Sequence, residues 1–429
     1  MRRKLENQLI AWKASNDRMP LIISGARQAG KTWLLEDFAK RNYQSYIRVS
    51  LDINKRVAAF FEKGTSVHQI VSLLEAEHGQ PIIPGHTLII LDEIQASEQA
   101  LASLKHFCED APQYHVASAG SLLGVALNRD KYSFPVGKVT TLDLYPMDFV
   151  EFLWAMQDEL LANEIRNSFD ALRPLNEGLH LKALQRLKEY YLIGGMPKCV
   201  QAFAQGTSTL ALPEVQNEIV NNYLADMAKY AKASETVKIR ACYNSLPSQL
   251  AKENRKFQYS LVKKGATASR FDTAIEWLDL AGVTLRSTKT TQGFQPITTH
   301  LDSSSFKLYM ADTGLLSMKS GVRQSDVLAG DAHHFKGALA ENYVAQQLAA
   351  AGHDLYYWTT DGMAELDFIT QTQQGVTAIE VKSGENTRSK SLNSFIKRYK
   401  PQRAVRLSLK PFGSGGSIMA VPLYAAFCL

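Results

Sequence analysis

The chain contains 429 residues, too many for one ordinary hydrophobic core, and this length indicates roughly two to four domains. Its hydrophobic content of 45% and charged content of 21% are typical of a soluble globular protein. The net charge is only +6, so basicity alone does not indicate a nucleic-acid-binding protein.

The cysteines and the hydrophobic segments narrow the type of protein further. Four cysteines occur singly along the sequence: Cys108, Cys199, Cys242 and Cys428. Isolated cysteines argue against a zinc site and against a disulfide framework, and they suit a reducing compartment. Glu6, Asn7 and Lys13 interrupt any N-terminal signal sequence, and no apolar run approaches the length of a membrane span. We therefore expect a cytoplasmic protein that has no membrane partner.

The first predicted elements are a helix over residues 1–18 and a buried strand over residues 19–24. A glycine-rich loop follows, and a helix with apolar residues at helical spacing then runs over residues 33–40. The loop matches the pattern G-x-x-x-x-G-K-[ST] and consists of Gly25, Ala26, Arg27, Gln28, Ala29, Gly30, Lys31 and Thr32. The context of strand, loop and helix is the one that a phosphate-binding loop requires.

The chemistry of this loop indicates a nucleoside triphosphate such as ATP. Its glycines let consecutive backbone N–H groups surround a polyphosphate, at a helix N-terminus that already favours an anion. We expect Lys31 to reach the β- and γ-phosphates and the Thr32 hydroxyl to bind Mg²⁺. Arg27 is either a further phosphate contact or a solvated loop charge.

Four more strands are predicted in the first third of the chain, over residues 45–51, 87–94, 114–121 and 138–145. Helical patterns separate them, which indicates an α/β fold with a doubly wound parallel sheet. Ligands of such sheets bind at the carboxyl ends of the strands, and the glycine-rich loop lies at that edge.

Acidic residues at the end of the third predicted strand supply the metal-binding carboxylate and the general base that the loop lacks. Asp92 follows an apolar run and could hold Mg²⁺, while the adjacent Glu93 could act as the general base for an attacking water. Ser121 closes the fourth predicted strand and could sense the γ-phosphate, although a serine in a turn is an equally good interpretation.

The middle of the chain is predominantly helical. Residues 146–205 have helical spacing that Gly194–Pro197 interrupts, and further helices are expected over residues 213–285. The order of helices and strand over residues 240–290 resembles a winged helix-turn-helix, with Lys263, Lys264 and Arg270 near the candidate recognition helix. A lid or a partner-docking module is the alternative interpretation.

The last hundred residues have a mixed α/β pattern with a second set of charged groups. Glu341 lies in an amphipathic helix, and Asp367, Glu380 and Lys382 lie in predicted strands. Two carboxylates and a lysine at adjacent strand ends could bind Mg²⁺ and activate a water for phosphodiester cleavage, with Glu341 completing the metal shell. The most basic stretch follows and contains Arg388, Lys390, Lys397, Arg398, Lys400, Arg403, Arg406 and Lys410. It is either a phosphate-tracking patch or a solvated face.

Several strings together resemble one family, the bacterial and archaeal AAA+-type P-loop ATPases with a C-terminal DUF4143 region. Besides the loop, the matching strings are Leu91–Gln95, Ala119–Ser121, Leu144–Phe152, Tyr191–Pro197 and Phe306–Leu316. The Glu341, Asp367, Glu380 and Lys382 set resembles the signature of the PD-(D/E)XK nuclease fold, whose relatives often bind nucleic acid without cutting it.

The resemblance implies roles for individual residues. Asp92 would be the metal carboxylate, Glu93 the catalytic base and Ser121 a sensor. Many members carry a Gly-Arg pair before the fifth strand, where this chain has Gly137-Lys138, and lysine lacks the planar fork of arginine. Arg129 is a weaker substitute for an arginine finger. The resemblance also implies a homo-oligomer, often a hexamer.

The expected domains are a P-loop ATPase core over residues 1–155, a helical lid over 156–210, a helical and winged-helix-like region over 211–330 and a restriction-endonuclease-like domain over 331–429. The DUF4143 region would span roughly residues 215–385.

Three functions follow as hypotheses: an Mg²⁺-dependent ATPase that moves DNA-facing modules, a nucleotide-regulated nuclease, and a non-enzymatic switch in which bound ATP fixes the domains for a protein partner.

Overall fold

The structure is a computed structural model that describes residues 1–429 except 63, 122–133, 254, 332–334, 361–363 and 385–387. The chain forms two compact units. The N-terminal unit comprises Arg2–Tyr145 with Leu280–Gly282, and the C-terminal unit comprises Met1, Pro146–Asp279 and Val283–Leu429. Among the helices that the structure describes, none has both the length and the apolar composition needed to cross a membrane.

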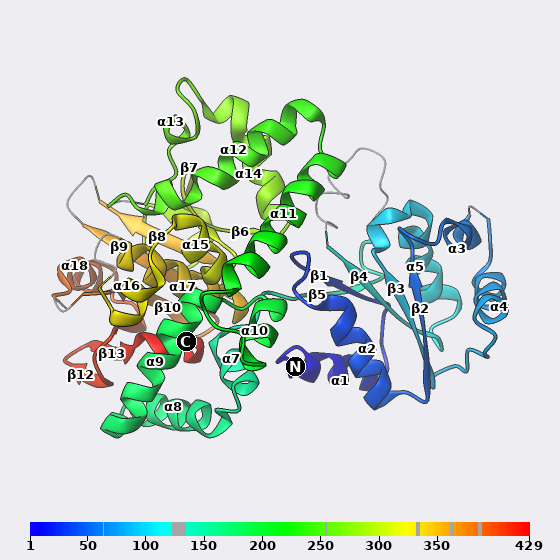
Figure 1. The fold of residues 1–429 in the computed structure, drawn as a ribbon, viewed down its shortest axis with the longest axis horizontal. Helices are drawn as coiled ribbons and strands as arrows, with labels where there is room; N and C mark the ends of the chain where they lie inside the picture. Colours follow the sequence, from blue (N-terminus) through cyan, green and yellow to red (C-terminus); the bar gives the residue numbers. More distant parts are fainter. Residues whose placement is uncertain (63, 122–133, 254, 332–334, 361–363, 385–387) are drawn as a thin grey trace. The chain divides into compact units, whose positions relative to one another are not determined.

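The N-terminal unit alternates strands and helices (Figure 1). Its elements are α1 (Glu6–Ala14), β1 (Leu21–Ser24), α2 (Lys31–Asn42), β2 (Ser45–Ser50), α3 (Lys55–Ala58), η1 (Ala59–Phe61), α4 (Val67–His78), β3 (Thr87–Asp92), η2 (Ile94–Ala96), α5 (Glu98–Asp110), β4 (His115–Gly120) and β5 (Thr140–Asp143). The strands form one sheet in the order β2-β3-β4-β1-β5, and every pairing in it is parallel. All five strands predicted from the sequence are confirmed, with ends that differ by one to two residues.

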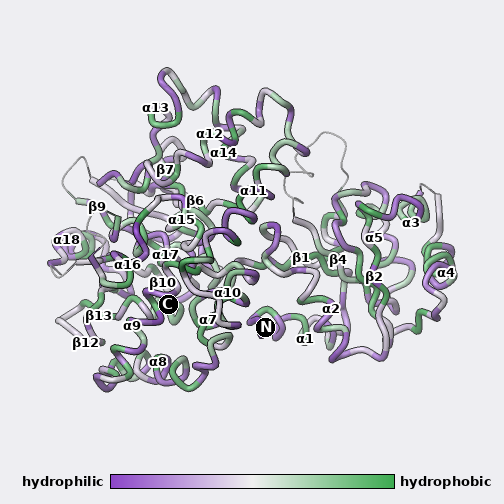
Figure 2. Tube along the Cα trace, viewed as in Figure 1, coloured by the Kyte–Doolittle hydropathy of each residue, from purple (hydrophilic) through white to green (hydrophobic). Residues whose placement is uncertain are grey.

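Side chains of each strand alternate between two hydrophobic cores, because successive residues of a strand point to opposite faces. Leu88 and Ile90 of β3 pack in a core with α1 and α2, whereas Ile89 and Leu91 pack in a core with α4 and α5. Strands β1 and β3 are almost wholly apolar as a result (Figure 2). Helices therefore cover both faces, and the prediction of a doubly wound parallel sheet is confirmed.

The C-terminal unit combines a helical part with a mixed sheet. Its helices are α7 (Phe149–Ala155), α8 (Glu159–Ala171), α9 (Glu177–Ile193), α10 (Pro197–Ala204), α11 (Leu212–Tyr230), α12 (Ala233–Leu250), α13 (Tyr259–Val262), α14 (Ala268–Leu280), η3 (Ile297–His300), α15 (Thr313–Ser320), α16 (Gln324–Ala329), α17 (Lys336–Ala350), α18 (Lys390–Tyr399) and η4 (Leu423–Cys428). Its strands are β6 (Thr284–Thr290), β7 (Leu301–Met310), β8 (Leu355–Thr359), β9 (Glu365–Thr372), β10 (Gly375–Val381), β11 (Arg403–Ser408), β12 (Gly413–Gly415) and β13 (Ile418–Pro422).

These strands form one eight-stranded sheet in the order β12-β13-β11-β10-β9-β8-β6-β7. Strand β6 pairs in parallel with β8, so strands from both sides of residue 330 belong to the same sheet. The sheet is therefore built from residues on both sides of residue 330, where the sequence predicted a domain boundary. Strands β8, β9 and β10 pair antiparallel, and α18 leads from β10 to the parallel strand β11.

A buried network of hydrogen bonds joins the strings that resemble the DUF4143-containing family. The Met147 amide donates to the Gly195 carbonyl at 2.7 Å, and the Gly195 amide donates to the Asp312 carboxylate at 2.6 Å. The other oxygen of Asp312 accepts from the Leu315 amide at 2.9 Å and so caps α15. A Cβ atom on Gly195 would lie 1.9 Å from the Met147 carbonyl oxygen, so only glycine fits there.

Helix α17 completes this network with polar side chains that are buried. Asn342 bonds both backbone groups of Met310, at 2.8 and 3.0 Å. Gln346 accepts from the Thr313 amide at 2.9 Å. Because a buried amide without a partner is costly, these side chains fix the positions of the segments that they bond.

Candidate functional site

The glycine-rich loop connects β1 to α2 in the N-terminal unit. Gly25 has φ of 138° and Gly30 has φ of 95°, conformations that glycine adopts without strain. A Cβ atom on Gly25 would lie 2.2 Å from the Leu144 carbonyl oxygen. The Lys31 ammonium lies within the loop and donates to the Gly25 and Ala26 carbonyls, each at 2.8 Å. The loop thus has a fixed shape and a buried cation at the start of α2.

The order of the strands brings the predicted polar residues to one edge of the sheet. Strand β4 lies between β1 and β3, so the loop, Ser121 and Asp92 lie at the carboxyl ends of neighbouring strands. The Thr32 hydroxyl donates to Oδ1 of Asp92 at 2.9 Å. The two residues predicted to bind a metal are therefore in direct contact.

Glu93 and Ser121 are also in contact. The Ser121 hydroxyl donates to Oε2 of Glu93 at 3.0 Å, and the Gln95 amide group donates to the same oxygen. Glu93 has φ of 52°, which is uncommon for a residue with a side chain and costs energy that the surroundings must supply. This turn after β3 directs Glu93 to the serine that follows β4.

Arg48 contacts this site and was not identified in the sequence. Its guanidinium group lies 2.8 Å from Oδ2 of Asp92 and 3.0 Å from Glu36. Asp92 therefore has one oxygen toward Thr32 and the other toward Arg48. The sequence does not reveal that β2 lies beside β3. The only signal in the sequence is that Arg48 is a charged residue between apolar residues of its strand.

Arg3 and Gln95 are two further residues that the sequence did not mark. The buried guanidinium group of Arg3 donates to the carbonyls of Ala29 and Tyr145, at 2.8 and 2.6 Å. It thus joins the loop to the segment after β5. Gln95 carries a weak signal, since it lies two residues after Glu93 in the string that resembles the family.

The charged residues considered as arginine fingers are arranged differently. Lys138 is partly exposed and forms an ion pair with Glu109 of α5, with 2.9 Å between Nζ and Oε1. The hydrogen bond to Glu109 raises the pKa of Lys138. Arg27 is a partly exposed loop residue, and Arg129 lies outside the described residues.

The residues present fit a nucleotide with Mg²⁺. A hydroxyl and a carboxylate oxygen meet at 2.9 Å, and such hard oxygen ligands suit Mg²⁺, which usually takes one or two carboxylates together with phosphates. Gly25 packs so closely on the Leu144 carbonyl that no side chain fits there, so the loop backbone keeps its shape, and Lys31 supplies a positive charge.

The C-terminal set of charged residues is built around Glu341, which is fully buried on α17. Its carboxylate pairs with Arg255 and with Lys307, the latter at 3.0 Å, and accepts from the Tyr309 hydroxyl at 2.5 Å. Lys307, also fully buried, lies 2.6 Å from Glu365. Burial alone would raise the pKa of Glu341, but the two cations outweigh it and hold this pKa well below its usual value. We call Arg255, Lys307, Tyr309, Glu341 and Glu365 the ionic cluster.

Asp367 and Glu380 lie on the adjacent strands β9 and β10. Asp367 accepts from the Val381 amide at 2.7 Å, and burial together with the negative charge of Glu341 raises its pKa. Glu380 pairs with Lys382, with 3.0 Å between Oε1 and Nζ. The structure thus brings Asp367 into the field of Glu341 and joins Glu380 to Lys382.

This arrangement does not fit the metal shell that the sequence suggested. Both oxygens of Glu341 are bonded to cations or to a hydroxyl, so this residue is a partner of Arg255 and Lys307. Among the described residues, no group of three or more His, Cys, Asp or Glu side chains could hold a metal ion. The cations of the ionic cluster come from residues that are distant in sequence, which explains why the pattern alone did not reveal them.

Three family models match successive parts of the chain. Residues 17–153 match the AAA domain, residues 184–326 match a domain of unknown function, DUF8612, and residues 336–426 match the domain of unknown function DUF4143. The chain therefore combines an AAA domain of the P-loop ATPase fold with a DUF4143 region, as the strings predicted. The DUF4143 match covers residues 336–426, whereas the resemblance implied a region over roughly residues 215–385.

Individual proteins match this chain only over a short segment or at low identity. Uncharacterized proteins of Mycobacterium bovis and Mycobacterium tuberculosis are each 40% identical over 78 residues, which cover 18% of this chain and only 17% of the length of those proteins. Among solved structures, the Walker-type ATPase paby2304 of Pyrococcus abyssi aligns with a TM-score of 0.44 and 15% identity. That alignment covers 74% of this chain and 95% of the other, and at this score it carries no inference about function.

Proposed function

We propose that the N-terminal unit binds ATP with Mg²⁺ and hydrolyses it. The observation that carries this proposal is the pair of contacts at one sheet edge, Thr32 with Asp92 and Ser121 with Glu93, beside the glycine-rich loop. A metal-binding pair and a base next to a phosphate loop are the components that phosphoryl transfer to water requires.

Each of these residues has a role in the proposed reaction. The loop amides and the Lys31 ammonium bind the phosphates, and Thr32 and Asp92 would hold Mg²⁺. When bound, Mg²⁺ neutralises charge on the phosphate oxygens. Glu93 orients the attacking water and accepts its proton, while Ser121 holds the Glu93 carboxylate in position. Arg48 fixes Asp92 from the other side.

The test separates binding from hydrolysis. Lys31→Ala should abolish binding of a fluorescent ATP analogue, because the loop loses its cation. Glu93→Gln should retain binding but lower the rate of phosphate release by about 100-fold or more, since general-base catalysis commonly contributes that much. Lys40→Ala, an exposed lysine of the same helix, is the matched control and should behave as wild type.

Two results would contradict the proposal. Unimpaired ATP turnover in Lys31→Ala, or turnover by Glu93→Gln at the wild-type rate, would remove the assigned roles. Stable ATP occupancy in the wild type with negligible turnover would instead support the non-enzymatic switch. Turnover in excess EDTA would contradict the requirement for Mg²⁺.

We further propose that hydrolysis is coupled to DNA bound by the C-terminal unit. Helices α12–α14 and the hairpin β6–β7 occur in the order expected of a winged helix-turn-helix, and Lys263, Lys264 and Arg270 are exposed in this segment. The exposed basic residues around α18 would add phosphate contacts. Single- or double-stranded DNA should stimulate turnover, and Lys263→Ala/Lys264→Ala/Arg270→Ala should lose the stimulation but keep the basal rate. Equal turnover with and without DNA would overturn the coupling.

Two predictions from the resemblance have simple tests. Light scattering with and without nucleotide should show an assembly if a neighbouring copy completes the ATP site, and a monomer throughout would argue against a shared site. Incubation of mixed DNA substrates with Mg²⁺ or Mn²⁺ should give cleavage that Lys382→Ala abolishes if the nuclease hypothesis holds. The absence of cleavage would reject that hypothesis, as the pairing of Glu341 already suggests.

The four cysteines occur singly in the sequence, a pattern that suits a reducing compartment. All four lie in the described part of the chain, and none forms a disulfide. We propose from the isolated positions of the cysteines in the sequence that the protein acts in the cytoplasm.

A further inference from the structure

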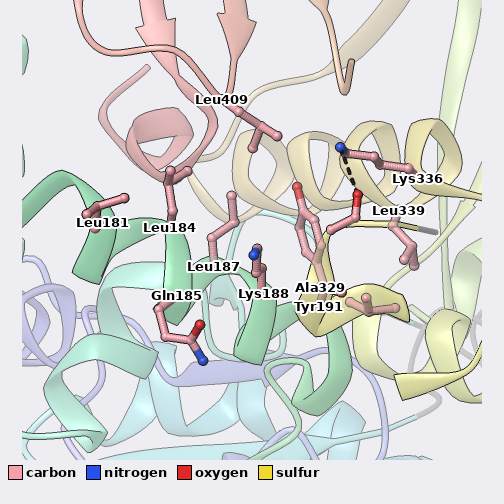
Figure 3. A pocket seen from close by; sticks show the side chains of 12 residues that line it. Leu181, Leu184, Gln185, Leu187, Lys188, Tyr191, Ala329, Lys336, Leu339 and Leu409 are labelled. Carbon is pink, nitrogen blue, oxygen red and sulfur yellow. Dashed lines mark hydrogen bonds between the residues drawn. The ribbon is translucent and has the colours of Figure 1, made fainter. Parts of the chain in front are cut away.

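A cavity of about 470 Å³ lies in the C-terminal unit, and its lining residues are different from those of the ionic cluster (Figure 3). Its walls come from α9, α16 and α17 and from Leu409, which follows β11. Apolar side chains dominate the lining: Leu181, Leu184, Leu187, Val327, Leu339 and Leu409. This volume lies in the range of about 300–1,000 Å³ that is usual for small-molecule sites, which are mostly apolar with a few polar groups.

Helix α9 presents a leucine face to this cavity rather than to a closed core. Leu181, Leu184 and Leu187 are spaced three residues apart and so lie on one side of the helix. Leu181 is 58% exposed at the rim, whereas Leu187 is buried deeper. A row of leucines that leads from solvent into an open cavity is suited to an extended apolar chain.

Three polar groups of the lining have unused hydrogen-bonding capacity. The Lys188 ammonium donates to the Leu328 carbonyl at 2.8 Å, and the Lys336 ammonium donates to the Gly330 carbonyl at 3.2 Å. Each ammonium has three donors, and the one hydrogen bond given for each lysine with the described residues goes to a backbone carbonyl. Tyr191 is 7% exposed, and its hydroxyl has no hydrogen-bond partner among the described residues.

The arrangement of these groups favours an anion. Figure 3 shows the Tyr191 ring standing among the lining side chains, with its hydroxyl directed toward Leu409, and Lys188 and Lys336 on the same cavity. A buried hydroxyl without a partner is unfavourable, and a ligand that accepts from it would remove this cost. Two ammonium groups beside an apolar cavity would repel a cationic ligand and attract a carboxylate.

We infer that this cavity is a binding site for an amphipathic monocarboxylate with an unbranched apolar tail. The tail lies along the leucines of α9 and against Leu339, and the carboxylate accepts hydrogen bonds from Lys188, Lys336 and the Tyr191 hydroxyl. The site belongs to the C-terminal unit and does not depend on the proposed ATPase activity.

The test uses decanoate as the probe and calorimetric titration of the full chain. Decanoate should bind saturably at one molecule per chain. Decanol, which has the same tail without the charge, should bind about tenfold more weakly, because charge-assisted hydrogen bonds are lost. Decyltrimethylammonium should show no saturable binding. An equal affinity for the cationic and anionic probes, or no saturable binding of decanoate, would overturn the inference.

Variants assign the binding to these residues. Lys188→Met/Lys336→Met should weaken decanoate by about tenfold or more, whereas Lys397→Met, an exposed lysine of α18, should leave it unchanged. Tyr191→Phe keeps the ring and removes only the hydroxyl that lacks a partner. It should weaken decanoate severalfold while the melting temperature stays equal or rises. Wild-type affinity in both the lysine pair variant and Tyr191→Phe would refute the assignment, and this second variant remains informative if the first fails to fold.

Discussion

Replacing Gly314 by alanine should destabilise the C-terminal unit although it improves the helix locally. Gly314 is the second residue of α15, and alanine is favoured over glycine in a helix by at most about 1 kcal/mol. A Cβ atom at this position would lie 2.4 Å from the backbone nitrogen of Gly194 and 2.4 Å from the carbonyl oxygen of Ile193. Because both neighbours are backbone atoms held in the buried network, they cannot rotate away. Overpacking commonly costs about 1–3 kcal/mol, and rigid neighbours place this case at the upper end. The net loss is therefore about 2 kcal/mol.

The matched control for this prediction is Gly178→Ala. Gly178 lies in the first turn of α9, and a Cβ atom there would have its nearest neighbour at an ordinary contact distance of 3.4 Å. This variant should keep or raise the melting temperature. Gly314→Ala should lower it by several degrees, since about 1 kcal/mol corresponds to roughly 2–4 °C in a unit of this size. A Gly314→Ala protein that melts at or above the wild-type temperature would refute the reasoning about the close approach.

Two further predictions concern charge and stability. Burial lowers the pKa of His115 from 6.5 to about 4, so between these values the unfolded chain binds a proton that the folded chain does not, and stability falls as the pH falls. The loss of unfolding free energy assigned to His115 between pH 7 and 5 is about 2 kcal/mol. In urea unfolding, His115→Gln should show a smaller loss over this pH range, and an unchanged loss would contradict the assignment. Lys307→Met leaves Glu341 buried with one cation fewer and should cost about 3–5 kcal/mol. The double variant Lys307→Met/Glu341→Gln should recover much of that loss in thermal melts. A Lys307→Met protein as stable as the wild type would contradict the prediction.

The ATPase fold could be predicted because its determinants are local in sequence. The apolar runs at residues 19–24 and 87–94 belong to strands that are buried on both faces, and such strands need no polar alternation. The loop residues are consecutive, so Lys31 and Thr32 were assigned directly. What the sequence did not contain is the strand order, and the contact between Arg48 and Asp92 depends on β2 lying beside β3.

The ionic cluster was missed for a related reason. Glu341 was identified from its helix, but its partners Arg255 and Lys307 lie 86 and 34 residues away in sequence. A carboxylate that is predicted alone suggests a metal ligand, whereas the same carboxylate between the buried Lys307 and the partly exposed Arg255 is already neutralised. Its chemistry depends on the tertiary contacts, and no spacing rule includes them.

The strings outside the glycine-rich loop have a different physical basis from the loop itself. Met147 bonds Gly195, Asp312 bonds Gly195, and Gly314 packs on Gly194, so three strings that are far apart in sequence form one buried network. Their glycines occur where a side chain would meet backbone atoms, and their polar residues satisfy buried amides. Such residues are needed for folding whatever the C-terminal unit binds. The strings therefore indicate a shared architecture, and a DNA, nuclease or carboxylate function has to be argued from Lys263, Lys382 or the cavity lining and tested there.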